Sequence, residues 1–122
     1  MAKYVDGYVL PIQKKNLPAY LKMAKKGAKI WKKYGALEYF ECAGDDLNPK
    51  WPGVKFPRLI GAKPSETVIF SFVVFKSRAD RDRINAKVMK DPDMSDPTYM
   101  GELMPFDEKR MVYGGFKTIV EG

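Results

Sequence analysis

The chain contains one strongly apolar run, Thr67-Val68-Ile69-Phe70-Ser71-Phe72-Val73-Val74-Phe75. Its β-branched and aromatic residues predict a β-strand. Alternate residues of a strand point to opposite faces, so both faces of this strand are apolar and Ser71 is the only polar residue inside it. Such a strand needs cover on both sides, and the elements that supply this cover determine the architecture.

The composition predicts one globular domain that spans residues 1–122. The chain has 45% hydrophobic and 30% charged residues, which is sufficient for a single core. We find no apolar run of the length of a membrane span and no apolar segment of a secretion signal at the N-terminus. A single cysteine, Cys42, excludes an internal disulfide and fits a reducing compartment. We therefore expect a cytoplasmic protein without a membrane partner.

The sequence contains no histidine. This removes the commonest general base and the usual protein ligand of haem, zinc and copper. It also leaves Cys42 without the partner of a Cys–His nucleophile pair. We expect neither a cofactor nor a metal.

The net charge of +7 is concentrated in one segment. Eight lysines and no acid lie between Lys14 and Lys33, and the remainder of the chain is almost neutral. Winding residues 17–34 as a helix places the lysines opposite an apolar stripe that includes Tyr20 and Trp31. We interpret the lysines as a solvated helix face, with contact to phosphate or an anionic membrane as the alternative.

Hydrophobic periodicity and turn residues predict six main elements. In chain order these are a strand at 4–10, a helix at 17–34, strands at 36–42 and 67–75, a helix that begins after Ser77, and a strand at 110–119. This β-α-β-β-α-β order predicts an α+β, ferredoxin-like fold with a four-stranded antiparallel sheet and two helices on one face.

Several residues predict where these elements end. Pro11 is expected to end the first strand, Asn16 to cap the first helix and Gly35 to stop it. Proline and glycine in the connection 44–66 exclude a long helix there. Residues 91–108 are expected to form a loop, with apolar anchors and a helical turn near Tyr99.

Two helices leave the second face of the sheet uncovered, and there are two ways to use such a face. Two subunits can stack their sheets and enclose a cavity, or exposed aromatic residues can stack on RNA bases. Phe70, Phe72 and Phe75 occupy the aromatic positions of the RNP1 pattern of RNA-recognition motifs. However, Val68-Ile69 replaces the leading basic residue and glycine of that pattern, so we favour the dimer and regard nucleic acid as the alternative.

Five stretches carry a resemblance to a known family, namely residues 4–8, 41–46, 70–72, 81–92 and 104–116. The chain resembles the YbaA-like uncharacterised bacterial proteins, a domain-of-unknown-function family of the dimeric α/β-barrel superfamily. The resemblance covers nearly the whole chain and implies a dimeric α/β barrel, a homodimer and a bacterial origin. It supplies no catalytic residues, and the wider superfamily includes cofactor-free monooxygenases, small isomerases, haem enzymes and ligand binders.

Asp6, Tyr8 and Tyr113 are the candidate catalytic residues. Strand alternation places Asp6 and Tyr8 on one face, together with Tyr4. If this is the uncovered face, Asp6 lies near phenols in a semi-enclosed cavity, where burial raises the pKa of its carboxyl group and suits it for proton transfer. The alternative is a buried carboxylate that is satisfied by a tyrosine hydroxyl or by Arg110.

A second group of candidates lies where the predicted second strand ends. Glu41, Asp45 and Asp46 supply oxygens that suit Mg²⁺ or Ca²⁺, but acids at such a corner more often cap turns, so we predict no metal site. The predicted ligand-binding set is Glu41, Asp45, Asp46, Phe70, Phe72 and Arg110.

Together these observations predict a homodimer that binds or processes a small hydrophobic molecule in a cavity between the sheets of its two subunits. If the protein is an enzyme, we expect a cofactor-independent monooxygenase or isomerase in which Asp6 transfers a proton with Tyr8 or Tyr113. An RNA-binding module and a structural dimer without a ligand are the alternatives.

Overall fold

The computed structural model describes residues 2–94 and 105–122. Its elements are β1 (Tyr4–Gln13), η1 (Lys14–Asn16), α1 (Leu17–Lys33), β2 (Glu38–Ala43), α2 (Phe56–Leu59), β3 (Glu66–Phe75), α3 (Arg78–Met89), η2 (Glu108–Arg110) and β4 (Val112–Lys117). The main elements follow the predicted order, and α2, η1 and η2 are short additions. The turn predicted near Tyr99 lies outside the described residues.

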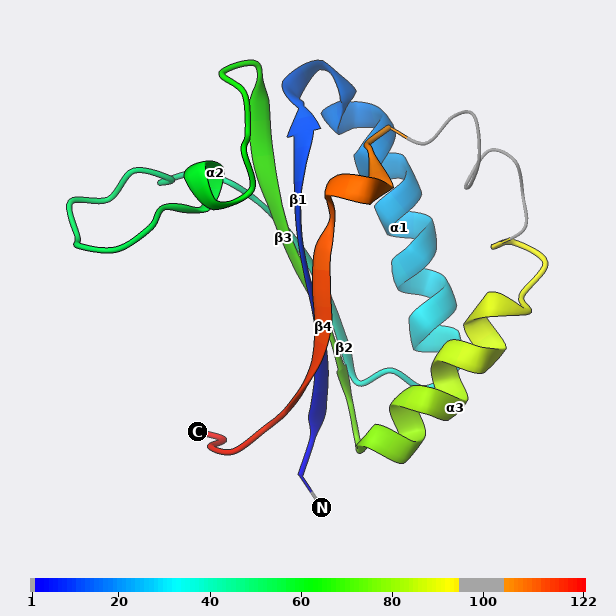
Figure 1. The fold of residues 1–122 in the computed structure, drawn as a ribbon. Helices are drawn as coiled ribbons and strands as arrows, with labels where there is room; N and C mark the ends of the chain where they lie inside the picture. The colour runs from blue at the N-terminus through cyan, green and yellow to red at the C-terminus, as the bar shows by residue number, and fades with distance from the viewer. Residues whose placement is uncertain (1, 95–104) are drawn as a thin grey trace.

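The four strands form one antiparallel sheet in the order β2-β3-β1-β4. Figure 1 shows α1 and α3 on one side of this sheet and the connection that contains α2 on the other side. The predicted ferredoxin-like sheet with two main helices on one face is therefore confirmed. No helix among the described residues combines the length and the apolar character needed to cross a membrane.

Strand β1 is longer than predicted, because it continues through Pro11 to Gln13. The pairing of β1 with β4 ends at Val9, whereas its pairing with β3 continues to Gln13. At Pro11 the strand therefore has a neighbour on only one side, and a residue without a backbone N–H is tolerated there. The prediction that Pro11 ends the strand was wrong for this reason.

The ends of the helices agree largely with the prediction. Gly35 follows α1 with a φ of 114°, a left-handed conformation that favours glycine. The Ser77 side chain caps α3 by accepting a hydrogen bond from the Asp80 backbone N–H at 3.1 Å. Asn16 occupies the position before α1 but makes no capping bond; its Nδ2 instead donates to the Pro105 carbonyl oxygen at 3.2 Å.

The helix-covered face of the sheet supports two separate core clusters. The first consists of Tyr4, Ile30, Ala36, Val73, Phe75, Ile84, Val88 and Met94. The second consists of Leu10, Ile12, Tyr20, Ala24 and Ile69. Helix α1 contributes to both clusters, and the partly buried Met23 packs against both. The core is therefore divided along the length of α1.

The other side of the sheet, which we name the open face, is not covered by α1 or α3. Its paired residues are Val5, Gly7, Val9, Pro11, Gln13, Glu38, Phe40, Cys42, Glu66, Val68, Phe70, Phe72, Val74, Val112, Gly114 and Phe116. The connection between β2 and β3 covers one end of this face, where the Phe56 ring packs edge-on against Phe70 with centroids 6.2 Å apart.

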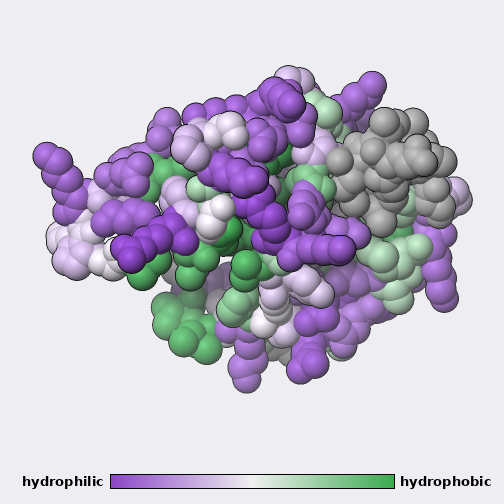
Figure 2. Space-filling model, turned by 45° about the horizontal axis from the view of Figure 1, so that its top comes forward, coloured by the Kyte–Doolittle hydropathy of each residue, from purple (hydrophilic) through white to green (hydrophobic). Residues whose placement is uncertain are grey.

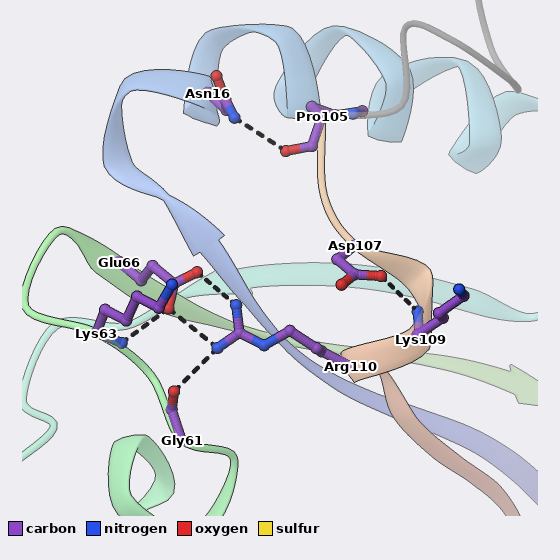
Figure 3. Close-up of polar contacts among 8 residues, drawn as sticks. All are labelled: Asn16, Gly61, Lys63, Glu66, Pro105, Asp107, Lys109 and Arg110. Atoms are coloured by element: carbon purple, nitrogen blue, oxygen red, sulfur yellow. Dashed lines mark hydrogen bonds and ion pairs between the residues drawn. The ribbon is translucent and has the colours of Figure 1, made fainter.

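An ion pair joins the start of β3 to η2, the short helix that precedes β4. Figure 3 shows Arg110 donating to both carboxylate oxygens of Glu66 at 2.7 and 3.0 Å and to the Gly61 carbonyl at 2.9 Å. These bonds lower the pKa of Glu66, which also accepts from the Lys63 backbone N–H. Arg110 therefore has a structural role, because it holds η2 against Glu66 and Gly61.

Gly115 makes room for two side chains on the helix-covered face. The register pairs it with Asp6 without a bulge. A Cβ atom at this position would lie 2.5 Å from both Arg81 Nη2 and the Tyr4 hydroxyl oxygen, which is closer than packed atoms allow. Gly115 is therefore required by the side chains that approach it.

We predict that Gly115→Ala lowers the free energy of unfolding by about 1–3 kcal/mol, because the added methyl group displaces Tyr4 and Arg81. Gly114→Ala is the matched control, since a Cβ there meets only ordinary contacts at 3.8 Å. Urea denaturation of both variants measures the difference. Equal stability of the two variants would show that Gly115 is not sterically required.

Candidate functional site

A row of polar residues crosses the whole sheet on its helix-covered face. Glu41 of β2 pairs with Ser71 of β3, Ser71 pairs with Tyr8 of β1, and Tyr8 pairs with Tyr113 of β4. The next row on one side contains Val73, and the next row on the other side contains Ile69. Because Val73 and Ile69 belong to different core clusters, the polar row separates these clusters.

A pocket of about 250 Å³ lies over this polar row, between the sheet and the helices. Its described lining residues are Tyr8, Leu10, Tyr20, Met23, Trp31, Tyr39, Glu41, Ser71, Val73, Met89, Met94, Phe106, Glu108 and Met111. Most of these side chains are aromatic or apolar. The gap in the core is therefore a hydrophobic cavity with a polar floor.

Two tyrosines hold the Glu41 carboxylate in place. The Tyr20 hydroxyl of α1 donates to Oε1 and the Tyr39 hydroxyl of β2 donates to Oε2, each at 2.7 Å. Hydrogen bonds to an ionised acceptor are stronger than those between neutral groups. A carboxylate has about four acceptor sites, so these bonds orient Glu41 without using all of its acceptor capacity.

Aromatic rings form much of the pocket wall. The Trp31 and Tyr39 rings lie 5.9 Å apart at an angle of 41°. Burial, with a further contribution from Asp6, raises the pKa of Tyr8 to about 12. The Tyr8 phenol, like an ordinary tyrosine, is neutral near pH 7, and the raised pKa keeps it protonated further into the alkaline range.

Asp6 lies on the same face but does not line the pocket. Its Oδ2 accepts a hydrogen bond from Asn85 Nδ2 at 3.2 Å, and Asn85 Oδ1 accepts from Trp31 Nε1 at 3.0 Å. Arg81 Nε lies 3.3 Å from Asp6 Oδ1 as an ion pair that lacks hydrogen-bond alignment. Burial raises the pKa of Asp6, while Asn85 and Arg81 oppose this shift.

The position of Asp6 bears on the two expectations for this residue. The expectation of a catalytic Asp6 required that its face be the uncovered one. Asp6 lies on the covered face, because Leu10 and Ile12 on the same side of β1 pack under the helices. Asp6 is 6% exposed, and this burial favours the alternative expectation of a buried carboxylate with partners. Its partners are Arg81 and Asn85, however, and not Arg110.

The other predicted residues lie in different places. Tyr113 stacks on Tyr8 with centroids 6.2 Å apart, but it is 71% exposed at the edge of the sheet. Phe70 and Phe72 lie on the open face, so the sheet separates them from Glu41. The predicted ligand-binding set is therefore not assembled as one site.

The acids near the end of β2 also separate. Glu41 points toward the pocket, whereas Asp45 and Asp46 are exposed in the connection that follows. Within the described part of the chain, no group of three potential metal ligands comes together.

Sequence reasoning missed Arg81 and the aromatic pocket wall. Arg81 precedes the buried Ile84 by three residues and the buried Val88 by seven, which is the spacing of one helix face, and this signal places it inward. Tyr20 and Trp31 were assigned correctly to the apolar stripe of α1. Their polar tips distinguish them from pure core residues, because such tips need partners when they are buried.

We predict that Arg81→Met lowers the free energy of unfolding at pH 7 by about 2–3 kcal/mol, because it leaves the Asp6 carboxylate buried without its counter-ion. Loss of Arg81 raises the pKa of Asp6 further. The loss of unfolding free energy relative to the wild type therefore becomes smaller as the pH falls through this raised pKa toward the pKa of an aspartate in the unfolded chain. Denaturation at pH 7 and pH 4.5 measures both effects.

Arg83→Met is the control on the same helix, since Arg83 makes a surface ion pair with Asp80 at 3.4 Å. The double variant Asp6→Asn with Arg81→Met should be more stable at pH 7 than Arg81→Met alone. If Arg81→Met loses no more unfolding free energy than Arg83→Met, and if this loss does not depend on pH, the ion pair between Arg81 and Asp6 does not stabilise the fold.

The chain is similar in sequence to proteins of undefined function. The family described as "Protein of unknown function (DUF1428)" matches residues 3–108. The "Uncharacterized protein YbaA" of Escherichia coli (strain K12) is 41% identical over 119 residues, which cover 98% of each chain. The protein of the same description from Shigella flexneri matches with the same identity and coverage.

Two solved structures share the fold at low sequence identity. A dimeric ferredoxin-like protein from an uncultured marine organism is 12% identical, with a TM-score of 0.67 and full coverage of both chains. A nipsnap family protein with unknown function from Agrobacterium tumefaciens str. C58 is 19% identical, with a TM-score of 0.56 and coverage of 95% of this chain and 87% of that one. The family match and the full-length identity to YbaA show that this chain belongs to the DUF1428 family.

Proposed function

We propose that this protein binds a small, largely apolar organic molecule in the pocket between its sheet and its helices. The observation that carries this proposal is the polar row that divides the core, with a hydrophobic cavity above it. Cores are normally packed without such voids, and an apolar pocket with a few positioned polar groups is the usual form of a ligand site.

The dimensions of the pocket favour a small ligand. Its volume of about 250 Å³ lies just below the usual range of roughly 300–1,000 Å³ for ligand sites. The ligand site proposed here differs in position from the cavity expected between two sheets, because the pocket lies on the helix-covered face. Proton transfer by Asp6 with Tyr8 or Tyr113 stays a prediction, and the partners of Asp6 favour a structural role.

The open face carries a cluster of exposed phenylalanine rings. Phe40 and Phe72 stack with centroids 5.0 Å apart, and Phe70 packs edge-on against Phe72 at 5.9 Å. Phe40, Phe70 and Phe116 are 47%, 43% and 63% exposed. Figure 2 shows hydrophobic residues at the surface in the lower left of the view, on the side of the sheet where the connection that contains α2 lies in Figure 1.

We propose that a second copy of this chain covers the open face. The charged paired residues of this face are Glu38 and Glu66, both acids, and none of its paired positions, all of them described, carries a lysine or arginine. A surface that stacks on RNA bases needs cations for the phosphates, so this distribution disfavours the RNA alternative. The dimeric state of the ferredoxin-like neighbour supports a homodimer.

For the pocket, we predict that the protein binds 2-naphthol, a small aromatic phenol, with a change in its fluorescence. Ser71→Leu should weaken this binding about tenfold or more, because Ser71 lies in the floor of the pocket. Phe72→Leu, one residue away on the opposite face, is the control and should bind normally. Loss of binding in Phe72→Leu but not in Ser71→Leu would place the site on the open face and contradict the proposal.

For the open face, we predict that Phe72→Asp converts a dimer into a folded monomer. A buried, unpaired carboxylate in the centre of an interface is strongly unfavourable. Sedimentation equilibrium measures the mass, and circular dichroism measures the fold. Lys29→Asp on the exposed face of α1 is the control and should stay dimeric. If Phe72→Asp keeps the dimeric mass of the wild type, the open face is not the interface.

A further inference from the structure

We propose that the pocket recognises a protonated organic amine on an apolar body, with Glu41 as the counter-ion of the ammonium group. This inference rests on the proposed function and names the class of its ligand. It follows from three observations, which are the charge of the lining, the orientation of Glu41 and the aromatic walls.

The charge of the lining is opposite to the charge of the chain. The protein has a net charge of +7, yet the two charged residues that line the pocket, among those the structure describes, are Glu41 and Glu108. A carboxylate in an apolar pocket attracts cations much more strongly than one in water, because the effective dielectric constant is lower. The pocket is therefore suited to a cationic ligand and unsuited to an anion.

The two tyrosine hydroxyls fix the direction of the Glu41 carboxylate. Tyr20 and Tyr39 each donate to a different oxygen of Glu41, so neither carboxylate oxygen is free to rotate away. The remaining acceptor sites suit a ligand that donates hydrogen bonds. An ammonium group offers up to three such donors and also neutralises the charge, which a hydroxyl group does not.

The aromatic walls strengthen this preference. Tyr8, Trp31 and Tyr39 present rings to the same cavity that Glu41 lines. The faces of these rings attract cations, and the attraction increases in a site that excludes water. The leucine and methionine side chains of the pocket accommodate the apolar body.

Three probes of similar size test this inference, namely 2-phenylethylamine, 2-phenylethanol and phenylacetate. Calorimetric titration of the full-length protein at pH 7 measures the affinity for each. We expect the amine to bind about tenfold more tightly than the alcohol, because only the amine brings a positive charge to the Glu41 carboxylate. Phenylacetate should bind most weakly, because Glu41 and Glu108 repel its charge.

A variant at Glu41 then tests the residue. Glu41→Gln should reduce the affinity for the amine about tenfold and change the affinity for the alcohol by less than about twofold. Glu38→Gln is the control, because Glu38 lies on the same strand but on the open face. Unchanged binding of the alcohol shows that the pocket of Glu41→Gln is intact, so a loss confined to the amine reports the missing charge.

Trp31 fluorescence shows where the amine binds. Trp51, which is 78% exposed, is replaced by phenylalanine so that Trp31 is the only reporter. We expect the amine to change the emission of Trp31, whereas no change at saturating amine would contradict binding in the pocket.

The outcomes separate this inference from the proposed function. If the alcohol or phenylacetate binds as tightly as the amine, the pocket binds ligands but the assignment to amines is wrong. The same conclusion follows if 2-naphthol binds and the amine does not. If neither the three probes nor 2-naphthol bind, both proposals fail.

Discussion

Strand β3 is apolar on both faces, and the two main helices of the chain cover only one of them. On the covered side, Ile69, Val73 and Phe75 are almost completely buried. On the open side, Phe70 is 43% exposed and forms one aromatic cluster with Phe72 and Phe40. Exposed apolar clusters of this kind usually mark an interface. The excess of apolar sheet surface therefore supports the proposal that one face holds the core and its pocket and that the other face is an interface.

The covered face is not a continuous core, and this interruption places the candidate site. A polar row of Glu41, Ser71, Tyr8 and Tyr113 crosses all four strands and separates two apolar clusters. Helix α1 spans both clusters and closes the space above the row with aromatic side chains. Buried polar groups are retained only where they are satisfied or used, and Glu41 is held by two tyrosine hydroxyls at the edge of the cavity.

The order of elements and the two-faced character of β3 were predictable, because they follow from strand alternation, helical periodicity and residues such as Gly35 that end elements. The row was predictable only in part. Glu41, Tyr8 and Tyr113 were selected as candidates, but their alignment depends on strand register, which one sequence does not reveal. The partner of Asp6 was missed because Arg81 lies 75 residues away along the chain. Likewise, Arg110 was assigned to a ligand site, whereas its contact with Glu66 arises from tertiary packing.

We propose that the open face is covered in solution, and fluorine NMR tests this proposal directly. The protein is labelled with 4-fluorophenylalanine, and a soluble gadolinium chelate is added to broaden the signals of rings that contact solvent. Phe75, which is fully buried in the single chain, is the internal reference. We expect the signals of Phe40, Phe70 and Phe72 to be protected nearly as well as that of Phe75. Broadening of these three signals in proportion to their exposure in the single chain would contradict it.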